Sequence, residues 1–164
     1  MSSLQIIQDH DKWRKGLGGA PAGLAGESDG NTYAGLDLNL ITFASTSFSG
    51  SSFSATTFQD AAWTACRFSA CTFSLCQMQR IRISECTFVG CTFSRSQFQG
   101  SNFSACVFTD CTWTDLNFDG SQWLGVSLPG CKGQQITGRD LVGERVDFTG
   151  SQFEDMQLTN ARIN

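Results

Sequence analysis

Residues 86–110 read CTFVG CTFSR SQFQG SNFSA CVFTD, five blocks of five residues with a phenylalanine at the centre of each. The same spacing continues in both directions, because every fifth residue from Phe43 to Leu128 is Phe, Trp, Met, Ile or Leu, and the phase returns at Phe148. All 14 phenylalanines and three of the four tryptophans occupy this position. A period of five matches neither the helical turn of about 3.6 residues nor the alternation of a long strand, so the chain must turn a corner every few residues.

Two positions of each block form the predicted core. One is the central large residue, and the other, two places before it, holds all eight cysteines and otherwise mostly Ser, Thr or Ala. Side chains two residues apart share one face of an extended strand, so both point inward and the remaining polar positions face water. The predicted aromatic core consists of Phe43, Phe48, Phe53, Phe58, Trp63, Phe68, Phe73, Phe88, Phe93, Phe98, Phe103, Phe108, Trp113, Phe118 and Trp123.

Units such as SSFSA (51–55), CTFSL (71–75) and SNFSA (101–105) resemble those of the pentapeptide-repeat family, and the resemblance covers roughly residues 34–164. It implies an all-β fold, a right-handed quadrilateral parallel β-helix with four pentapeptides per coil, in which residues twenty apart stack. We expect about six coils, spaced by roughly 4.8 Å. Residues 1–33 are then a short N-terminal helical cap with a Gly-rich link, and residues 34–164 are the β-helix, irregular at 129–147.

The cysteines fall into columns when residues twenty apart are stacked. Cys71, Cys91, Cys111 and Cys131 form one column, Cys66, Cys86 and Cys106 form another, and Cys76 stands alone. Stacked Cα atoms are within disulfide range, but the side chains run inward in parallel, and a straight column does not converge on a metal ion. We therefore favour buried free thiols at all eight positions over a disulfide or a metal site. Reduced thiols favour a cytoplasmic origin.

The two ends of the chain differ in sequence. Near the N-terminus, the apolar residues Leu4, Ile6 and Ile7 lead into DHDKWRKG (9–16), a predicted helix with Asp9 as N-cap and Gly16 as its stop. Trp13 is expected to cover the first coil, and His10, the only histidine, is a polar residue of this cap because it has no catalytic partner. A His-x-x-Trp leader before a Gly-rich link also resembles the start of many bacterial pentapeptide-repeat proteins.

At residues 161–164 the sequence ARIN is still in repeat. A solenoid exposes its core at each end. Either this end forms a homodimer, or the last coil is shielded in another way, or the chain is part of a longer protein.

One stretch breaks the repeat. Between Pro129 and Val146 the large-residue position holds Gly133, Gly138 and Gly143, and apolar residues lie two places earlier. Either the small and large inward positions swap for one coil, or residues are inserted near 130–133 and 143–145 and form protruding loops. This is also the most charged part of the repeat, and irregularities of a regular scaffold often carry binding sites. The candidate partner-binding residues are Lys132, Arg139, Asp140, Glu144 and Arg145.

Composition and charge exclude several classes of function. A net charge of −4 and a pI near 4.8 lack the basic footprint needed to bind nucleic acid or an anionic membrane directly. No run of 18 apolar residues and no Sec-type leader occurs, so we expect no membrane association. We find no triad, phosphate loop or metal-ligand spacing, and the predicted interior is filled by phenylalanine, so we expect no enzyme and no cofactor.

These features favour a rigid, non-catalytic interaction or scaffold module of a bacterial system. The alternative comes from family members of the quinolone-resistance and microcin-immunity type, which resemble B-DNA and engage DNA gyrase or topoisomerase IV. Here the shaft from Ile41 to Leu128 departs from such a mimic, because four arginines and five acidic residues leave a charge of only −1. Stacking also pairs Asp60 with Arg80 and Arg95 with Asp115, which neutralises their charges.

A third interpretation comes from one face of the predicted coil, where outward hydroxyl pairs recur every twenty residues. Flat arrays two hydroxyls wide resemble those of ice-binding β-solenoids, although ice binders favour threonine in both files. The pairs are Ser52/Ser54, Thr72/Ser74, Thr92/Ser94 and Thr112/Thr114.

Overall fold

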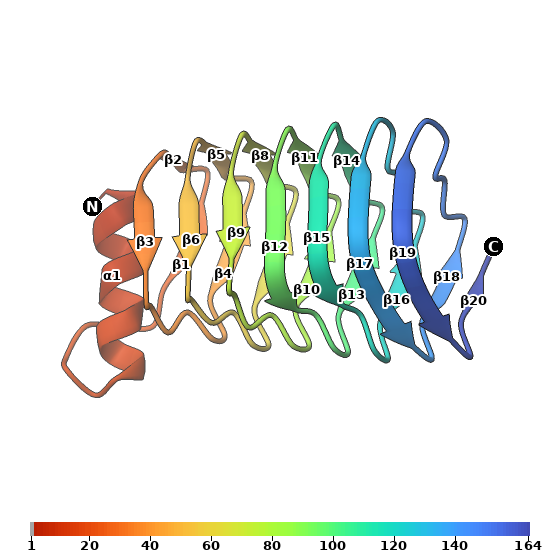
Figure 1. The fold of residues 1–164 in the computed structure, drawn as a ribbon. Coiled ribbons are helices and arrows are strands. Elements are labelled where there is room, and N and C mark those ends of the chain that lie inside the picture. Colours follow the sequence, from red (N-terminus) through yellow and green to blue (C-terminus); the bar gives the residue numbers. More distant parts are fainter. Residues whose placement is uncertain (1) are drawn as a thin grey trace.

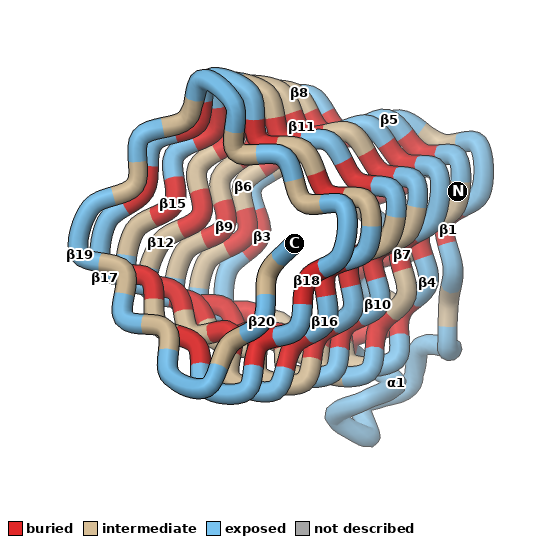
Figure 2. Tube along the Cα trace, turned by 90° about the vertical axis from the view of Figure 1, so that its right-hand side faces the viewer, coloured by how far each residue is buried: buried red, intermediate tan, exposed pale blue. Residues whose placement is uncertain are grey.

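A parallel β-helix accounts for most of the molecule (Figure 1). The computed structural model describes residues 2–164, in which one helix, α1 (Ser3–Arg14), precedes short strands that wind along one axis. In Figure 2, which looks at the C-terminal end, the chain runs counterclockwise as it advances toward the viewer, so the winding is right-handed. The all-β, right-handed solenoid with an N-terminal helix is therefore confirmed, with about seven coils instead of six.

Three parallel sheets form three sides of the coil. The first sheet contains β1 (Gly23–Ala25), β4 (Thr42–Ala44), β7 (Ala62–Thr64), β10 (Arg82–Ser84), β13 (Asn102–Ser104), β16 (Gln122–Leu124), β18 (Val142–Glu144) and β20 (Arg162–Ile163). The second contains β2 (Ser28–Asp29), β5 (Ser47–Ser49), β8 (Arg67–Ser69), β11 (Thr87–Val89) and β14 (Val107–Thr109). The third contains β3 (Thr32–Ala34), β6 (Ser52–Ser54), β9 (Thr72–Ser74), β12 (Thr92–Gln97), β15 (Thr112–Asn117), β17 (Lys132–Arg139) and β19 (Gln152–Thr159).

The fourth side is held by single bridges that run from Asp37 through Thr57 and Gln77 to Gln97, and farther along by the C-terminal halves of the long strands of the third sheet. From the second coil onward, partners in adjacent strands are twenty residues apart, as in Phe68 opposite Phe88. Successive corners are formed by every fifth residue in the left-handed region, for example Ala55 at φ 49° and Asp60 at φ 59°. The five-residue period of the sequence is therefore one straight segment plus one corner.

Aromatic columns fill the interior. Phe48, Phe68, Phe88 and Phe108 stack with ring centroids 4.7, 4.7 and 4.6 Å apart and almost parallel planes. Adjacent columns meet edge to face, as in Phe53 against Phe58 at 70°. Every residue of the predicted aromatic core is at most 2% exposed. In Figure 2 the buried residues (red) recur along each coil and line up from one coil to the next.

The β-helix begins earlier than the predicted boundary at residue 34. β1 already pairs with β4, and Leu24 lies opposite Phe43, so much of the expected link belongs to a first coil. The pairing offset is 19 residues for β1 and β2, because Leu24 meets Phe43 and Asp29 meets Phe48, and it becomes 20 at β3, where Tyr33 meets Phe53. The inward positions hold Leu24, Asp29 and Tyr33 instead of phenylalanine. The different spacing and residue types hid this coil from the repeat pattern.

The cap also differs from the prediction. α1 starts with Ser2 as N-cap, in a capping box with Gln5, and not with Asp9. Ile7 is fully buried against the first coil, whereas Trp13, the residue expected to cover it, remains 38% exposed. Asp29 ties the helix to the coil, because its carboxylate accepts hydrogen bonds from the hydroxyls of Ser3 and Tyr33.

Residues 129–147 keep the regular winding. Gly133 lies opposite both Trp113 and Phe153, and Ile136 lies opposite both Leu116 and Met156, so the offset of twenty is unbroken. The insertion hypothesis, with its protruding loops, is therefore wrong. Ile136 is fully buried, as is Leu141, which means that the small and large inward positions exchange in this coil.

Candidate interaction surface at the C-terminal end

The five charged residues singled out in the sequence lie around the perimeter of one coil. Lys132 projects from the outer face of the third sheet, the chain turns a corner at Gln135, and Arg139 and Asp140 lie at the corner after that. Glu144 and Arg145 follow at the end of β18. All five are exposed, but they occupy different sides of the solenoid. The structure therefore brings together two neighbouring pairs and leaves Lys132 apart.

We call these five residues the charged belt. Contacts to the adjacent coils fix the backbone of the belt. The backbone N–H of Arg139 donates to Asp119 Oδ1 at 2.8 Å, and the side chain of Asn160 donates to Asp140. Lys132 is paired in register between Thr112 and Gln152. No ion pair involves any of the five within residues 2–164.

The C-terminal end of the solenoid has a group of apolar side chains that the structure leaves half-exposed. Residues 148–163 form the last coil, whose inward side chains have a neighbouring coil on only one side. They surround an open hollow of about 340 Å³, which is lined by Phe148, Ser151, Phe153, Met156, Leu158 and Ile163. Sequence reasoning missed these residues as a site, although their place in the repeat marks them as core.

The edge of this end is a long strand. β19 spans eight residues and pairs with β17 on one side only. Around it stand polar and charged groups, among them Glu154, Asp155 and Arg162, all exposed. An apolar centre with a polar rim and an open strand edge is the composition of a protein interface.

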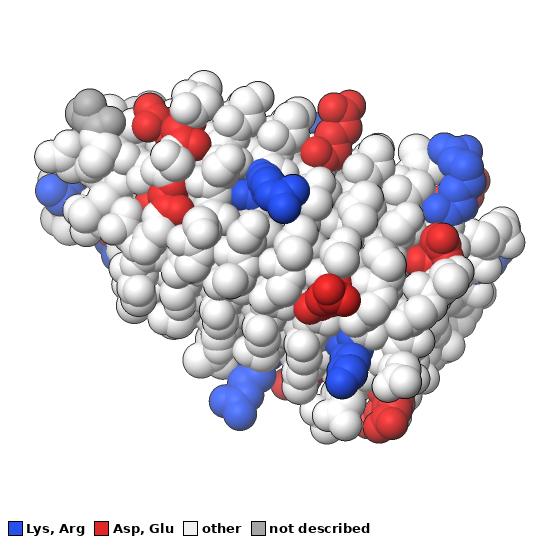
Figure 3. Space-filling view, turned by 90° about the horizontal axis from the view of Figure 1, so that it is seen from above, with Lys and Arg blue, Asp and Glu red and all other residues white. Residues whose placement is uncertain are grey.

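The shaft between the two ends carries few charges of mixed sign. Asp60 and Arg80 stack as expected and form an exposed ion pair with Nε to Oδ1 at 2.9 Å. The second expected pair does not form, since Arg95 and Asp115 share no ion pair within residues 2–164. Figure 3 shows one face, on which basic and acidic residues are scattered among uncharged ones. No extended acidic surface is visible on that face.

The thiols line the interior. All eight cysteines are unpaired and buried. Several donate to backbone carbonyls of the preceding coil, as Cys131 does to Phe108 at 2.9 Å. Burial raises the pKa of the Cys76 and Cys106 thiols to about 11. Their reactivity at neutral pH is correspondingly low, because the thiolate is the reactive form.

The outer face of the third sheet shows the expected hydroxyl files. Thr72, Thr92 and Thr112 are consecutive partners. The files end at β17, which has Lys132 and Gln134 at the corresponding positions.

Within residues 2–164, no group of three or more His, Cys, Asp or Glu side chains is arranged to hold a metal ion. In the same range, no helix has the length and apolar character needed to cross a membrane.

Comparison with known proteins gives one family match. Residues 61–137 match the model described as a pentapeptide repeat region. No curated protein matches the chain.

Solved structures with similar folds include HetL, a pentapeptide repeat protein involved in heterocyst differentiation regulation from the cyanobacterium Nostoc sp. strain PCC 7120. It shows 13% identity and a TM-score of 0.40 over 85% of this chain and 86% of that one. Rfr23 from the cyanobacterium Cyanothece 51142 shows 9% identity and a TM-score of 0.43 over 99% of this chain and 100% of that one. A trypsin-treated form of QnrB1, a plasmid-mediated fluoroquinolone resistance protein, shows 16% identity and a TM-score of 0.22 over 82% and 92%.

Proposed function

Because this chain is a pentapeptide-repeat protein, we propose that it is a rigid, non-catalytic module that binds a protein partner through its C-terminal end. The observation that carries the proposal is the apolar hollow lined by Phe148, Phe153, Met156, Leu158 and Ile163. Removal of apolar surface of this kind from water by a partner lowers the free energy of the complex. Within residues 2–164, stacked and buried aromatic rings fill the interior, so the proposal places the partner at the end of the solenoid.

The charged belt supplies the rim of this interface. Arg139, Asp140, Glu144 and Arg145 lie one coil behind the open end, and together with Lys132 they set the charge pattern that an approaching partner meets. Rim charges mainly govern the rate and specificity of association, whereas the buried centre provides most of the affinity. The same proposal puts the protein in a reducing compartment such as the cytoplasm, since eight unpaired thiols suit it.

The test is a binding experiment with matched surface variants. The protein is immobilised, proteins captured from a lysate of its source organism are identified, and each is then purified and titrated against the variants. Met156→Asp should abolish binding, because it places a charge in the hollow. Leu75→Asp, at a 52% exposed corner of the shaft, is the control and should bind normally. A purified partner that binds Met156→Asp as tightly as the unmodified chain contradicts the proposal.

A homodimer through the same end is the second candidate, and the open edge of β19 favours it. Two copies would then pair their β19 strands and cover both hollows. Sedimentation equilibrium distinguishes the two candidates, because a dimer dissociates on dilution and on substitution of Met156 by Asp. A chain that stays monomeric at high concentration leaves the hollow to a different protein.

DNA mimicry is the alternative for which the charge pattern gives little support. A mimic of B-DNA needs a strongly negative surface, and the shaft has a charge of only −1 between Ile41 and Leu128. Inhibition or protection of gyrase supercoiling by the purified protein at micromolar concentration would favour the alternative over the proposal above.

A further inference from the structure

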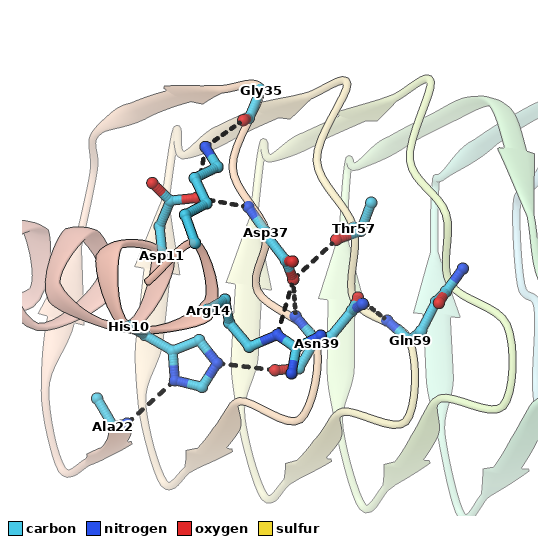
Figure 4. Close-up of polar contacts among 10 residues, drawn as sticks. His10, Asp11, Arg14, Ala22, Gly35, Asp37, Asn39, Thr57 and Gln59 are labelled. Carbon is cyan, nitrogen blue, oxygen red and sulfur yellow. Dashed lines mark hydrogen bonds and ion pairs between the residues drawn. The ribbon is translucent and has the colours of Figure 1, made fainter. Parts of the chain in front are cut away.

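The only histidine of the chain lies between the cap helix and the first coil. The His10 side chain is 1% exposed, and Figure 4 shows its two ring nitrogens directed at two different backbone groups. Nε2 lies 2.7 Å from the carbonyl oxygen of Asn39, and Nδ1 lies 3.0 Å from the backbone nitrogen of Ala22. His10 therefore bridges α1 to the coil through both nitrogens.

These partners require a neutral imidazole in one tautomer. The Asn39 carbonyl can only accept a hydrogen bond, so Nε2 must carry the proton. The Ala22 N–H can only donate, so Nδ1 must offer a lone pair. Both bonds form together in the Nε2–H form alone.

Protonation of His10 destroys this arrangement. The new proton on Nδ1 would point at the N–H of Ala22, so two donors would face each other beside an imidazole that is only 1% exposed. A buried charge and a buried amide without an acceptor are both unfavourable. When α1 separates from the coil, the imidazolium and the Ala22 N–H can both form hydrogen bonds with water.

The charged groups around His10 do not offset this cost by direct contact. Asp11 pairs with Lys15 at 2.8 Å, and Asp37 of the first coil pairs with Arg14 at 3.2 Å. Neither carboxylate has a hydrogen bond to the imidazole. On the same helix, Asp9 and Lys12 make no side-chain bond to it, and the neighbouring ring, Trp13 at 5.3 Å, is uncharged.

We propose that His10 makes the N-terminal cap proton-sensitive: the cap is closed at neutral pH, and protonation of His10 releases α1 from the first coil. Release uncovers the N-terminal end of the core, where Ile7 packs in the closed state.

The direction of the pH dependence follows from which state of the cap binds the proton. The open state takes up a proton and the closed state excludes it, so the closed cap loses stability relative to the open cap as the pH falls. If each opening event takes up one proton, the ratio of open to closed cap rises by up to about tenfold for each unit that the pH falls.

Two measurements on the unmodified protein test this directly. Because His10 is the only histidine, the ¹⁵N signals of a ¹⁵N-histidine-labelled sample report its tautomer and titration without further assignment. Hydrogen exchange between pH 8 and pH 5, corrected for the intrinsic rate, reports the opening of α1, with the amides of β8 and β11 as internal reference. We expect the Nε2–H tautomer at neutral pH and a loss of α1 protection with the same midpoint as the imidazole titration.

The matched variant is His10→Gln, which keeps one donor and one acceptor but does not titrate. Its α1 protection should not depend on pH over this range. The proposal is overturned if the imidazole titrates while α1 protection stays constant, or if the variant loses protection with the same pH dependence. If the variant is uncapped at every pH, the proposal is judged on the unmodified protein alone: the midpoints of the imidazole titration and of the loss of α1 protection must coincide, and midpoints that differ overturn it.

Discussion

Gly133 and Phe153 are partners in adjacent strands of the third sheet, and the Phe153 ring fills the space in which a side chain at position 133 would lie. A Cβ atom added to Gly133 would be 2.2 Å from Cδ1 of Phe153. The ring reaches past the glycine to the Trp113 ring, with centroids 6.0 Å apart. The missing side chain in one coil is thus compensated by a large one in the next.

Gly133→Ala should therefore destabilise the protein, because the Phe153 ring has to move out of the core. Overpacking of this kind costs about 1–3 kcal/mol in unfolding free energy, which urea denaturation measures. The double variant Gly133→Ala with Phe153→Ala is the control and should be no less stable than Phe153→Ala alone. An equal loss from Gly133→Ala in both backgrounds would show that the ring is not the cause.

Phe68→Ala should be among the most destabilising substitutions in the chain. Phe68 is fully buried and stacks on Phe48 and Phe88 at 4.7 Å. Truncation of a buried phenylalanine costs about 3–5 kcal/mol, measurable by urea denaturation. Phe153→Ala is the comparison, since the last coil leaves Phe153 half-exposed, and its loss should be clearly smaller. Similar losses at both positions would mean that the C-terminal end is covered in solution.

Asp29→Asn should weaken the cap and change its acid response. Burial alone would raise the pKa of Asp29, but hydrogen bonds from Ser3, Ser51, Tyr33 and Asn31 hold it below its usual value. The carboxylate form thus favours the folded state, so its contribution is complete at neutral pH and is lost as the pH falls below about 4. The variant should lose about 1–3 kcal/mol at pH 7, because an amide cannot accept all these bonds.

The measurement is thermal unfolding of both proteins from pH 7 to pH 2, with the cap followed by the exchange of α1 amides. The difference between the unmodified protein and Asp29→Asn should shrink toward low pH. A difference that stays constant with pH would show that the charge of Asp29 is not what the fold uses.

Thiol labelling should separate the folded from the unfolded chain completely. All eight cysteines are buried and unpaired, so a maleimide should not label the native protein at pH 7. After denaturation without reductant, mass spectrometry should find eight labels on each chain. Fewer labels would reveal a disulfide or a bound metal, and rapid labelling of the native protein would reveal an open core.

The sequence pattern alone predicted the core and the stacking by twenty. In a solenoid each residue contacts residues at a constant separation in the chain, so the spatial neighbours of Phe68 can be read from a linear repeat. The same logic anticipated the Asp60–Arg80 pair and the two cysteine columns. It failed for Arg95 and Asp115, because stacked backbones do not oblige two flexible exposed side chains to meet.

Where the repeat loses its period, the sequence was compatible with several local structures, and only the tertiary structure distinguished them. It placed Asp29 in a phenylalanine position of a first coil with an offset of 19 residues, where hydroxyl groups from α1 and two coils make a buried carboxylate acceptable. It also showed that Ile7 and His10 are buried while Trp13 stays 38% exposed, and that the five charged residues lie around the perimeter of one coil.

The amino-acid sequence by itself thus determined the five-residue winding and the composition of the core, because these depend on contacts at constant separation along the chain. The two ends were decided by tertiary structure alone, because the cap and the open hollow arise from contacts between segments with no common period.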